Sequence, residues 1–304
     1  MTQETKDFAF LHFIVLIWGF TAILGVLIDL PSVEMVFFRT MIASAGLLIL
    51  IFARKKSLKF SLKKDYWITF GTGGLIAAHW ILFFLSARIS NVSICLAGMA
   101  TASLWTSFFE PFANKTKIKG YEVVLSVIAF FGIVVIFNVE FDHIIGLAVA
   151  IVSAMLSGMF TVINGKVTKR ADPFVITFYE MLSATVFIAF FFPIYLQLDG
   201  IDSLNLAPTM NDWFYLLILG LVCTVFAYSY SVKLMQRLSA FSINLTVNLE
   251  PVYGIAMALI LFPEREKMTS GFYLGTALIL ISVLIYPVLN RIYKRRALDL
   301  DNLR

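Results

Sequence analysis

Ten apolar runs, each long enough to cross the hydrocarbon core of a bilayer, divide this chain from end to end. They cover residues 8–28, 33–53, 66–86, 92–112, 121–138, 144–163, 174–196, 213–232, 241–262 and 271–290. A transmembrane helix needs about 20 predominantly apolar residues. Because 60% of the residues are hydrophobic and 14% are charged, against roughly a quarter charged in a soluble domain, no soluble domain is expected.

The runs show no strand-like alternation, and a chain in lipid must satisfy its backbone hydrogen bonds within itself. We therefore predict an all-α polytopic membrane protein with ten transmembrane helices. The first run follows the stretch "MTQETKD", which is not basic, and no small-residue cleavage site comes after it. It is expected to be a retained helix and not a signal peptide.

Lysine and arginine predict how the helices are oriented. With the N-terminus inside, 20 of the 24 basic residues fall in cytoplasmic parts, three fall outside, and Arg39 lies within the second run. Such a bias follows the positive-inside rule and predicts cytoplasmic termini in a multi-pass protein of the cytoplasmic membrane. The membrane orientation then explains the net charge of +5, and no nucleic-acid partner is expected. The tail "RIYKRR" contacts anionic membrane lipid or acts as a stop signal.

Ten helices divide into two sets of five, in which similar stretches return in the same order. The second run carries "VFFRTMIASA" and the seventh "TFYEMLSATV", which places Arg39 opposite Glu180. The stretch "VSICL" in the fourth run aligns with "FSINL" in the ninth. Since five crossings are an odd number, the second half enters from the other side. We expect inverted repeats over residues 1–138 and 139–304, with the binding site near the midplane and alternating access.

Four motifs accompany this repeat: Trp18-Gly19, Arg39 after an aromatic pair, "LEPV" at 249–252, and "PEREKMTSGFYLG" at 263–275. Together they resemble the ten-helix EamA-type branch of the drug/metabolite transporter superfamily over about residues 8–290. The resemblance implies export or exchange of amino acids, metabolites or drugs. The first-half hinge, "EPFANKTKIKGYE", departs from the pattern of the second half, so a symmetric gate is in doubt.

Glu250 and Pro251 stand near the middle of the ninth run, where an ionisable side chain costs on the order of 3 kcal/mol and usually faces a cavity. Proline lacks an N–H and disrupts the hydrogen bond to the carbonyl of Val247. That carbonyl, the Asn248 amide and the Glu250 carboxylate then lie within one turn, as in the broken-helix sites of transporters. The alternative is a proline kink with a protonated or paired glutamate.

Further candidates are Arg39, Glu180, His79, Trp18 and Tyr253. Arg39 binds a substrate carboxylate or a fixed structural partner, and Glu180 either takes part in coupling or snorkels to the interface. His79 is either proton-linked or hydrogen-bonded across helices. Trp18 and Tyr253 line a pocket or pack within the bundle.

The pattern favours a secondary transporter, an exporter or exchanger of small metabolites such as amino acids or amphipathic compounds. No Walker-type phosphate loop occurs, so the energy would come from a gradient, with Glu250 or Glu180 carrying a coupled proton. A passive facilitator or lipid flippase stays open as an alternative. An intramembrane enzyme is not expected, because H-E-x-x-H is absent and the three histidines lie in different segments. No cofactor or metal is expected, and the oligomeric state is left undetermined.

Overall fold

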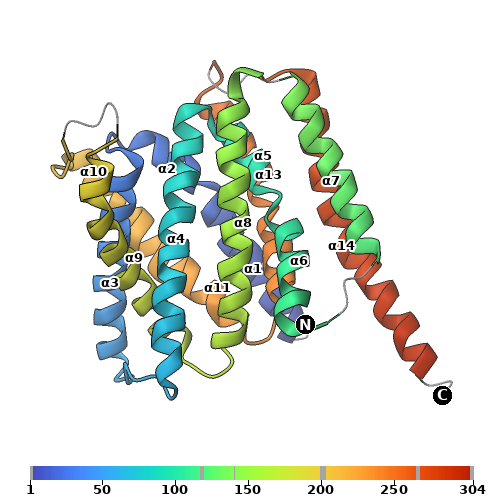
Figure 1. The fold of residues 1–304 in the computed structure, drawn as a ribbon, viewed down its shortest axis with the longest axis horizontal. Helices are drawn as coiled ribbons and strands as arrows, with labels where there is room; N and C mark the ends of the chain where they lie inside the picture. The colour runs from blue at the N-terminus through green and yellow to red at the C-terminus, as the bar shows by residue number, and fades with distance from the viewer. Residues whose placement is uncertain (1–2, 117–119, 140, 199–202, 265–267, 302–304) are drawn as a thin grey trace.

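The computed structural model describes residues 3–116, 120–139, 141–198, 203–264 and 268–301, and every regular element in these ranges is helical (Figure 1). In chain order the elements are α1 (Gln3–Gly19), α2 (Thr21–Leu27), α3 (Ser32–Ala53), α4 (Lys63–Ile89), α5 (Val92–Met99), α6 (Ala102–Asn114), α7 (Gly120–Val139), η1 (Phe141–His143), α8 (Ile144–Val167), α9 (Pro173–Tyr195), α10 (Met210–Leu217), η2 (Ile218–Tyr228), α11 (Ser229–Leu234), α12 (Ala240–Val247), α13 (Glu250–Leu261) and α14 (Ser270–Asp301).

Eight helical segments in the described residues are long and apolar enough to cross a membrane. They are Gln3–Leu27, Ser32–Ala53, Lys63–Ile89, Val92–Asn114, Ile144–Val167, Pro173–Tyr195, Met210–Leu234 and Ala240–Leu261. Two shorter apolar stretches, Gly120–Ile136 and Ser270–Ser282, lie in α7 and α14. Ten apolar helical segments are thus present at the predicted places, and eight reach spanning length.

Several of these segments are not continuous α-helices. The first is interrupted between α1 and α2 at Phe20, the fourth between α5 and α6 at 100–101, and the ninth between α12 and α13 at 248–249. The last two interruptions lie within one residue of each other when "VSICL" is aligned with "FSINL". Pro251 lies in the first turn of α13, where a missing N–H removes no helical bond.

The segment η2, residues Ile218–Tyr228, is a π-helix. A side-chain hydrogen bond has the same spacing of five residues: the Thr224 hydroxyl donates to the Leu219 carbonyl at 2.8 Å. π-helical turns are rare and are frequently found at functional sites. η2 packs against α1, α3, α10 and α11.

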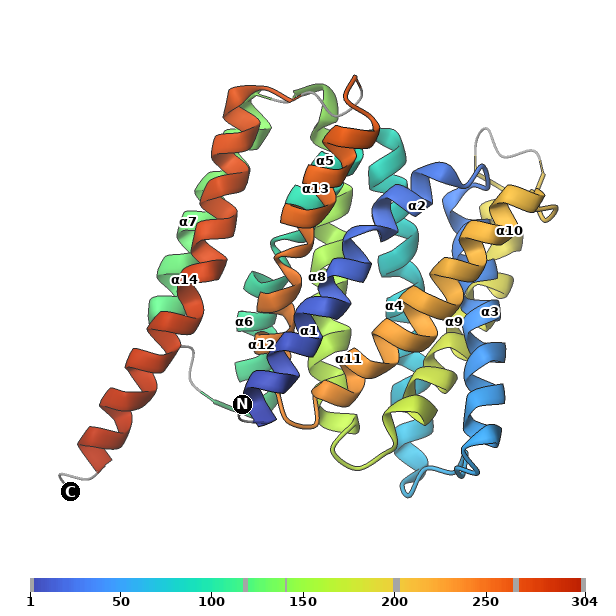
Figure 2. The ribbon, with the colours of Figure 1, turned by 180° about the vertical axis from the view of Figure 1, so that it is seen from behind.

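Two views of the ribbon show how the helices are distributed. α4 packs against both α8 and α9, and α3 packs against α9 and η2. The pair α7 and α14 stands at one edge of the bundle (Figures 1 and 2). The start of α1 and the end of α14 lie at the same, lower end of the bundle in Figure 1. This end, which carries the connections 54–62, 168–172 and 235–239, is called the basic end below.

Glycine sets the distance between α7 and α14. A Cβ atom added to Gly132 would lie 2.6 Å from the carbonyl oxygen of Gly275, and one added to Gly275 would lie 2.6 Å from that of Gly132. Close approach of this kind is how transmembrane helices gain packing without a hydrophobic driving force. The two backbones therefore cross in direct contact.

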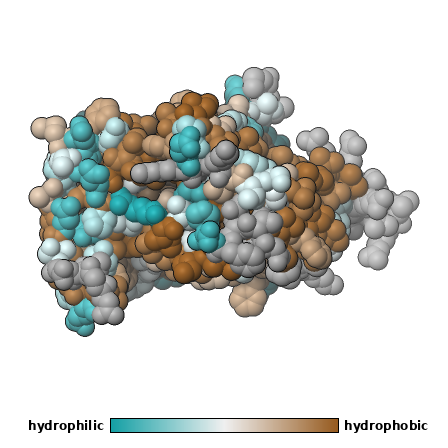
Figure 3. All heavy atoms as spheres, turned by 90° about the horizontal axis from the view of Figure 1, so that it is seen from above, coloured by the Kyte–Doolittle hydropathy of each residue, from teal (hydrophilic) through white to brown (hydrophobic). Residues whose placement is uncertain are grey.

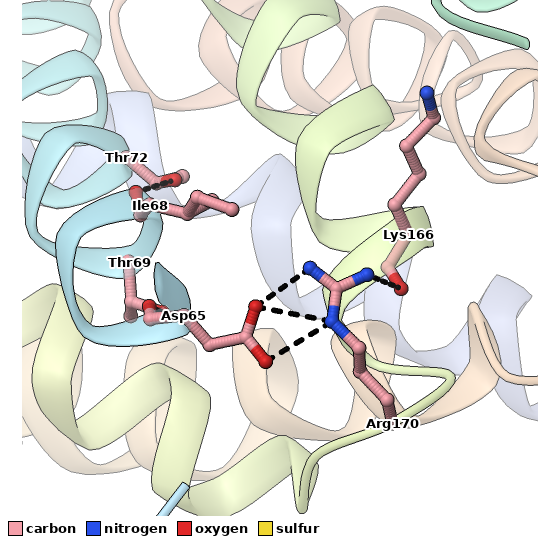
Figure 4. Close-up of polar contacts among 6 residues, drawn as sticks. All are labelled: Asp65, Ile68, Thr69, Thr72, Lys166 and Arg170. Atoms are coloured by element: carbon pink, nitrogen blue, oxygen red, sulfur yellow. Dashed lines mark hydrogen bonds and ion pairs between the residues drawn. The ribbon is translucent and has the colours of Figure 1, made fainter. Parts of the chain in front are cut away.

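Ion pairs join separate helices at the basic end. Arg170, between α8 and α9, donates from Nε and Nη2 to the buried Asp65 of α4 at 3.0 and 2.6 Å (Figure 4). This neighbouring carboxylate raises the pKa of the Arg170 guanidinium, which stays charged at any physiological pH. Arg237 is bound in the same bidentate way to Asp7 of α1, at 2.5 and 2.7 Å. A more exposed pair joins Lys56 to Asp172, the N-cap of α9.

The opposite end is held by a different arrangement. The Nη2 atom of Arg88 donates to the carbonyl oxygens of Gly25 and Ile28 at 3.1 and 2.6 Å. Nearby, Asp212 accepts from the backbone N–H of Asp29 at 2.8 Å. Figure 3, which looks onto this end, shows hydrophilic side chains gathered over it and hydrophobic ones at its edges. The end of the first membrane segment is thereby tied to α4 and α10.

Candidate functional site

A cavity lies inside the bundle, between the basic end and the opposite end. The space in it that is open to water is about 70 Å³. Its walls come from α1, α2, α3, α4, α5, α8, η2, α11, α12 and α13, so both halves of the chain contribute. The lining residues include the polar side chains Thr21, Arg39, His79, Ser157, Thr161, Tyr228, Ser231, Asn244 and Glu250, with Trp18, Trp80, Phe83, Met99 and Phe160 among the apolar ones.

Arg39 is the basic side chain of this lining. It is buried, and its Nε donates to the Thr224 hydroxyl of the π-helix at 3.0 Å. Its guanidinium carbon lies 3.7 Å from the centroid of the Trp80 ring. An arginine side chain has five N–H donors, and among the described residues only the Nε donor of Arg39 has a protein partner. The remaining donors are free to bind a ligand in the cavity.

Glu250 is the acidic side chain of the same lining. It is the first residue of α13, where the helix dipole favours a negative charge. Its carboxylate lies beside Thr21 and within the field of Arg39. In the described part of the chain no N···O distance of 4.0 Å or less joins the two charges. An arginine and a glutamate therefore face one cavity without a direct ion pair between them.

His79 is fixed by a bond across helices. Its Nδ1 lies 2.9 Å from the carbonyl oxygen of Ser153 on α8, and the Ser153 hydroxyl donates to the His79 carbonyl at 2.8 Å. Because a carbonyl oxygen is an acceptor only, Nδ1 carries the proton. This geometry corresponds to the interhelical alternative of the two roles predicted for His79. The side chain nevertheless lines the cavity.

Trp18 links α1 to the π-helix. Its indole N–H donates to the carbonyl oxygen of Cys223 at 3.1 Å, so the ring is held at the cavity wall where α1 ends. The Thr21 hydroxyl donates back to the Trp18 carbonyl at 2.7 Å, across the interruption at Phe20. The first segment is thus interrupted next to the cavity.

Glu180 does not line the cavity. It is fully buried on α9, and its Oε2 accepts a hydrogen bond from the Tyr228 hydroxyl at 3.1 Å. The same hydroxyl accepts from Asn164 Nδ2 at 2.9 Å. Tyr228 is part of the cavity wall, so Glu180 lies one side chain behind it.

Asn248 and Tyr253 also lie away from the cavity. Asn248 donates from Nδ2 to the Ser103 hydroxyl of α6 at 2.6 Å and is buried at the interruption of the ninth segment. Tyr253 packs beside Gly19 of α1. Asn244, one turn before Asn248, does line the cavity, and it donates to the Thr106 hydroxyl at 2.7 Å.

The structure therefore brings four of the predicted side chains to one cavity: Arg39, Glu250, His79 and Trp18. It adds residues that the sequence reasoning did not place there, notably Trp80, Phe160, Asn244 and Thr161. Trp80 follows His79 directly, and Phe160 and Thr161 stand in "GMFT" of the sixth run, which is similar to "GFT" at 19–21 in the first run. These two sequence features could have identified the residues. The direction in which the Asn244 side chain points depends on the helix interruption, which the sequence does not show.

A second cavity opens at the basic end. The space in it that is open to water is about 270 Å³, and it is lined by Lys166, Lys169 and Arg237, among others. The buried side chain of Met235 lines both this cavity and the central one. A single methionine thus lies between the two spaces. No group of three potential metal-ligating His, Cys, Asp or Glu side chains occurs among the residues that the structure describes.

Eight candidate spans around a polar internal cavity define a multi-pass integral membrane protein with a site for a small molecule. The chain belongs to the EamA-like transporter family, whose sequence profile matches residues 8–138 and 144–286. This confirms the family that the motifs predict, and it makes the protein a transporter and not an enzyme. The two matched ranges indicate two repeat halves.

Two known proteins match this chain over nearly its whole length. A protein of Archaeoglobus fulgidus described as an uncharacterized transporter is 24% identical over 286 residues, which are 92% of this chain and 98% of that protein. A solved crystal structure superposes with a TM-score of 0.68 at 16% sequence identity, covering 93% of this chain and 98% of the other. At that identity the second likeness shows the fold alone.

Proposed function

We propose that this protein is a secondary transporter of zwitterionic small metabolites, above all amino acids with an apolar side chain, and that it works by alternating access. The observation that carries the proposal is the placement of Arg39 and Glu250 in one cavity without a direct ion pair. Two opposite charges that stay apart in a low-dielectric site leave room for a ligand that carries both charges itself.

The chemistry of the two groups supports a zwitterion. A guanidinium binds a carboxylate with parallel hydrogen bonds, and Arg39 keeps free donors for this purpose. A carboxylate such as Glu250 accepts hydrogen bonds from an ammonium group. Burying either charge of a ligand without a partner would cost several kcal/mol, on the order of the penalty for an isolated ion. Paired at both ends, an amino acid avoids that cost.

The apolar part of the cavity favours a large apolar or aromatic side chain. Trp18, Trp80, Phe83 and Phe160 contribute rings to the lining, and the Phe160 ring lies 5.3 Å from that of His79. Aromatic surfaces of this size supply apolar contact with little loss of side-chain freedom. A small hydrophilic substrate would leave these rings facing water.

The halves 1–138 and 139–304 are proposed to be inverted five-helix repeats that cross the cytoplasmic membrane ten times in all. The matching interruptions of the fourth and ninth segments and the shared side of the two chain ends support this arrangement. The distribution of 20 basic residues against three supports cytoplasmic termini. Met235, between the central cavity and the basic end, supports access from the cytoplasm.

Counterflow in proteoliposomes tests the substrate class. Proteoliposomes would be preloaded with unlabelled phenylalanine, phenethylamine or 3-phenylpropanoate, and the uptake of labelled phenylalanine would be measured. Phenethylamine and 3-phenylpropanoate keep the ring, and each lacks one of the two charges of the amino acid. We expect saturable counterflow for phenylalanine and little for either analogue. Equal counterflow of the amine or the acid would contradict the zwitterion site. Movement of labelled phospholipid, with no response to any amino acid, would support a lipid flippase.

Glu250→Gln tests the acidic partner within the same assay. The amide keeps the size of the side chain and removes its charge, so the substrate ammonium loses its ion pair. Normal transport by Glu250→Gln between about pH 5 and pH 8, the range of ordinary histidine titration, would show that the carboxylate is not needed. A passive facilitator would show counterflow but no accumulation against a gradient.

A further inference from the structure

Glu180 has surroundings that are unusual for a carboxyl group within a membrane segment. It has no exposed surface, and its Oε1 atom is buried without a hydrogen-bond partner among the described residues. Its Oε2 accepts from the Tyr228 hydroxyl, and the Asn164 amide lies beside the same carboxyl group. A carboxylate in such a place without a cation would cost several kcal/mol, on the order of the effective penalty for one buried ion. The geometry therefore favours a neutral, proton-bearing acid.

The charged and titratable groups on the helices around α9 are engaged elsewhere. Within the spans of α3 and α4, Arg39 is bound to the π-helix and His79 to α8. Nearer the helix ends, Glu34 accepts from the Asn205 N–H, Asp65 is paired with Arg170, and Arg88 donates to the Gly25 and Ile28 carbonyls. At the basic end, Lys166 of α8 donates to the Ala113 carbonyl, and Lys233 of α11 lies over the Tyr230 ring at 5.4 Å. Tyr228 is thus the titratable side chain that meets Glu180 in the described residues.

α4 covers the remaining side of Glu180. A Cβ atom at Gly73 would lie 2.5 Å from the Glu180 carbonyl oxygen and 1.9 Å from Ser183 Oγ, so the two backbones touch at this level. No side chain larger than that of glycine fits between α4 and α9 at Gly73, and the groove that reaches Ser183 is lined mainly by apolar and aromatic side chains. The polar connection between Glu180 and the rest of the protein therefore runs through the Tyr228 hydroxyl.

Tyr228 faces Glu180 on one side and the cavity on the other. Its ring lies 6.0 Å from that of Trp80, in an edge-on arrangement, and it belongs to the cavity lining. A phenol hydroxyl has one donor and two acceptor positions. The donor goes to Glu180 and one acceptor position is taken by Asn164. The second acceptor position is left for water in the cavity.

We propose that Glu180, Tyr228 and Asn164 form a proton site behind the cavity wall, through which this transporter couples substrate movement to a proton gradient. The proposal rests on the proposed transport function. It adds a carrier that does not touch the substrate: Arg39 and Glu250 bind the cargo, and Glu180 holds the proton. Tyr228 is a relay, and Asn164 is a positioning residue that orients its hydroxyl.

Loading transfers one proton and leaves no other product. Tyr228 passes its hydroxyl proton to Oε2 of the Glu180 carboxylate, while the phenol oxygen takes a proton from a cavity hydronium ion. The phenol is regenerated, the hydronium becomes water, and Glu180 becomes a neutral acid. Release runs in the opposite order when the cavity faces the other side of the membrane.

The experiment separates exchange from gradient-driven transport in proteoliposomes. Phenylalanine counterflow needs no net proton movement, whereas accumulation driven by an imposed pH gradient does. We expect Glu180→Gln to keep counterflow within about twofold and to lose gradient-driven accumulation by about tenfold or more. Tyr228→Phe removes the relay oxygen and is expected to lower accumulation more than counterflow. Glu34→Gln, at a buried glutamate away from the cavity, and Tyr230→Phe are matched controls that should behave like the wild type.

A second readout does not depend on transport. Infrared spectra of the wild type are expected to contain the carbonyl band of a protonated carboxyl group that Glu180→Gln lacks and Glu34→Gln retains. Accumulation by Glu180→Gln at the wild-type level, or a spectrum without that band, would overturn the proposal. If no amino acid undergoes counterflow in the wild type, the zwitterion proposal fails, while the infrared band still decides whether Glu180 holds a proton.

Discussion

The guanidinium carbon of Arg39 lies 3.7 Å from the centroid of the Trp80 ring, stacked on one wall of the central cavity. A cation over an indole face is stabilised by roughly 0.5–2 kcal/mol, with the larger values where water is excluded. The same guanidinium is held by the Thr224 hydroxyl. Arg39 is therefore fixed on two sides, with its remaining donors free for a ligand.

The first prediction concerns Arg39→Lys, which keeps the charge and loses both contacts. A hydrogen bond to a charged group contributes about 1.5–3 kcal/mol, and about 1.4 kcal/mol corresponds to a tenfold change in affinity. We expect the KM for phenylalanine counterflow to rise about tenfold or more. Met41→Leu, at another residue of α3, is the control. An unchanged KM in Arg39→Lys would show that any positive charge is sufficient.

The second prediction compares two ion pairs at the basic end. Asp65 is 1% exposed and accepts three hydrogen bonds from Arg170, whereas the side chains of Lys56 and Asp172 are 36% and 32% exposed. We expect Asp65→Asn to lower the free energy of unfolding by about 1–3 kcal/mol and Lys56→Met by less than about 1 kcal/mol. Thermal unfolding in detergent measures both. Equal decreases in the free energy of unfolding would indicate that the burial of Asp65 does not strengthen its ion pair.

The third prediction uses two glycines of α4 that lie two residues apart. A Cβ atom at Gly73 would overlap Ser183 Oγ at 1.9 Å, whereas nothing lies within 4 Å of one at Gly71. We expect Gly73→Ala to destabilise the protein by about 1–3 kcal/mol through overpacking. Gly71→Ala should be neutral or stabilising by up to about 1 kcal/mol, because alanine is the better helix former. If Gly73→Ala were tolerated equally well, α4 and α9 would have to pack less closely than described.

The fourth prediction concerns Met235, which lies between the central cavity and the cavity at the basic end. The probe is Ser157→Cys, on the cavity wall, in a background where the buried Cys95 and Cys223 are replaced by alanine. We expect Met235→Ala to accelerate labelling by a thiol reagent added on the side of the basic end about tenfold, which corresponds to a barrier lower by about 1.4 kcal/mol.

Met99→Ala is the control for that experiment, because Met99 lines the central cavity but not the cavity at the basic end. The labelling rate of Met99→Ala should match that of the Ser157→Cys background in which both methionines are kept. Equal acceleration in both variants would show that the volume of the side chain matters and its position does not.

Much of the fold could be predicted because apolar runs of bilayer length leave few alternatives. Arg39, Glu250 and His79 were also identifiable, since ionisable side chains within such runs are rare and usually face a cavity. Their common position around one cavity follows from packing between helices far apart in the chain. The sequence similarity of the two halves also predicted a binding site between them.

Other features depend on tertiary contacts that a sequence does not display. The π-helix at 218–228 follows from the packing of α3 and α1 on it, and no motif marks its wider turn. The interruption at Phe20 has no proline or glycine at its centre. Asn248 was expected beside Glu250, but the interruption between them resets the helical phase and turns its amide to Ser103. The aromatic walls could not be selected from 30 phenylalanines and 11 tyrosines.

The reciprocal contact between Gly132 and Gly275 has a consequence for how this chain can vary over generations. A side chain at either position is excluded by the backbone of the other, at 2.6 Å in both directions. No compensating change exists at the partner, because glycine is already the smallest residue. Each position is therefore restricted to glycine whatever residue stands at the other, although 142 residues lie between them in the chain.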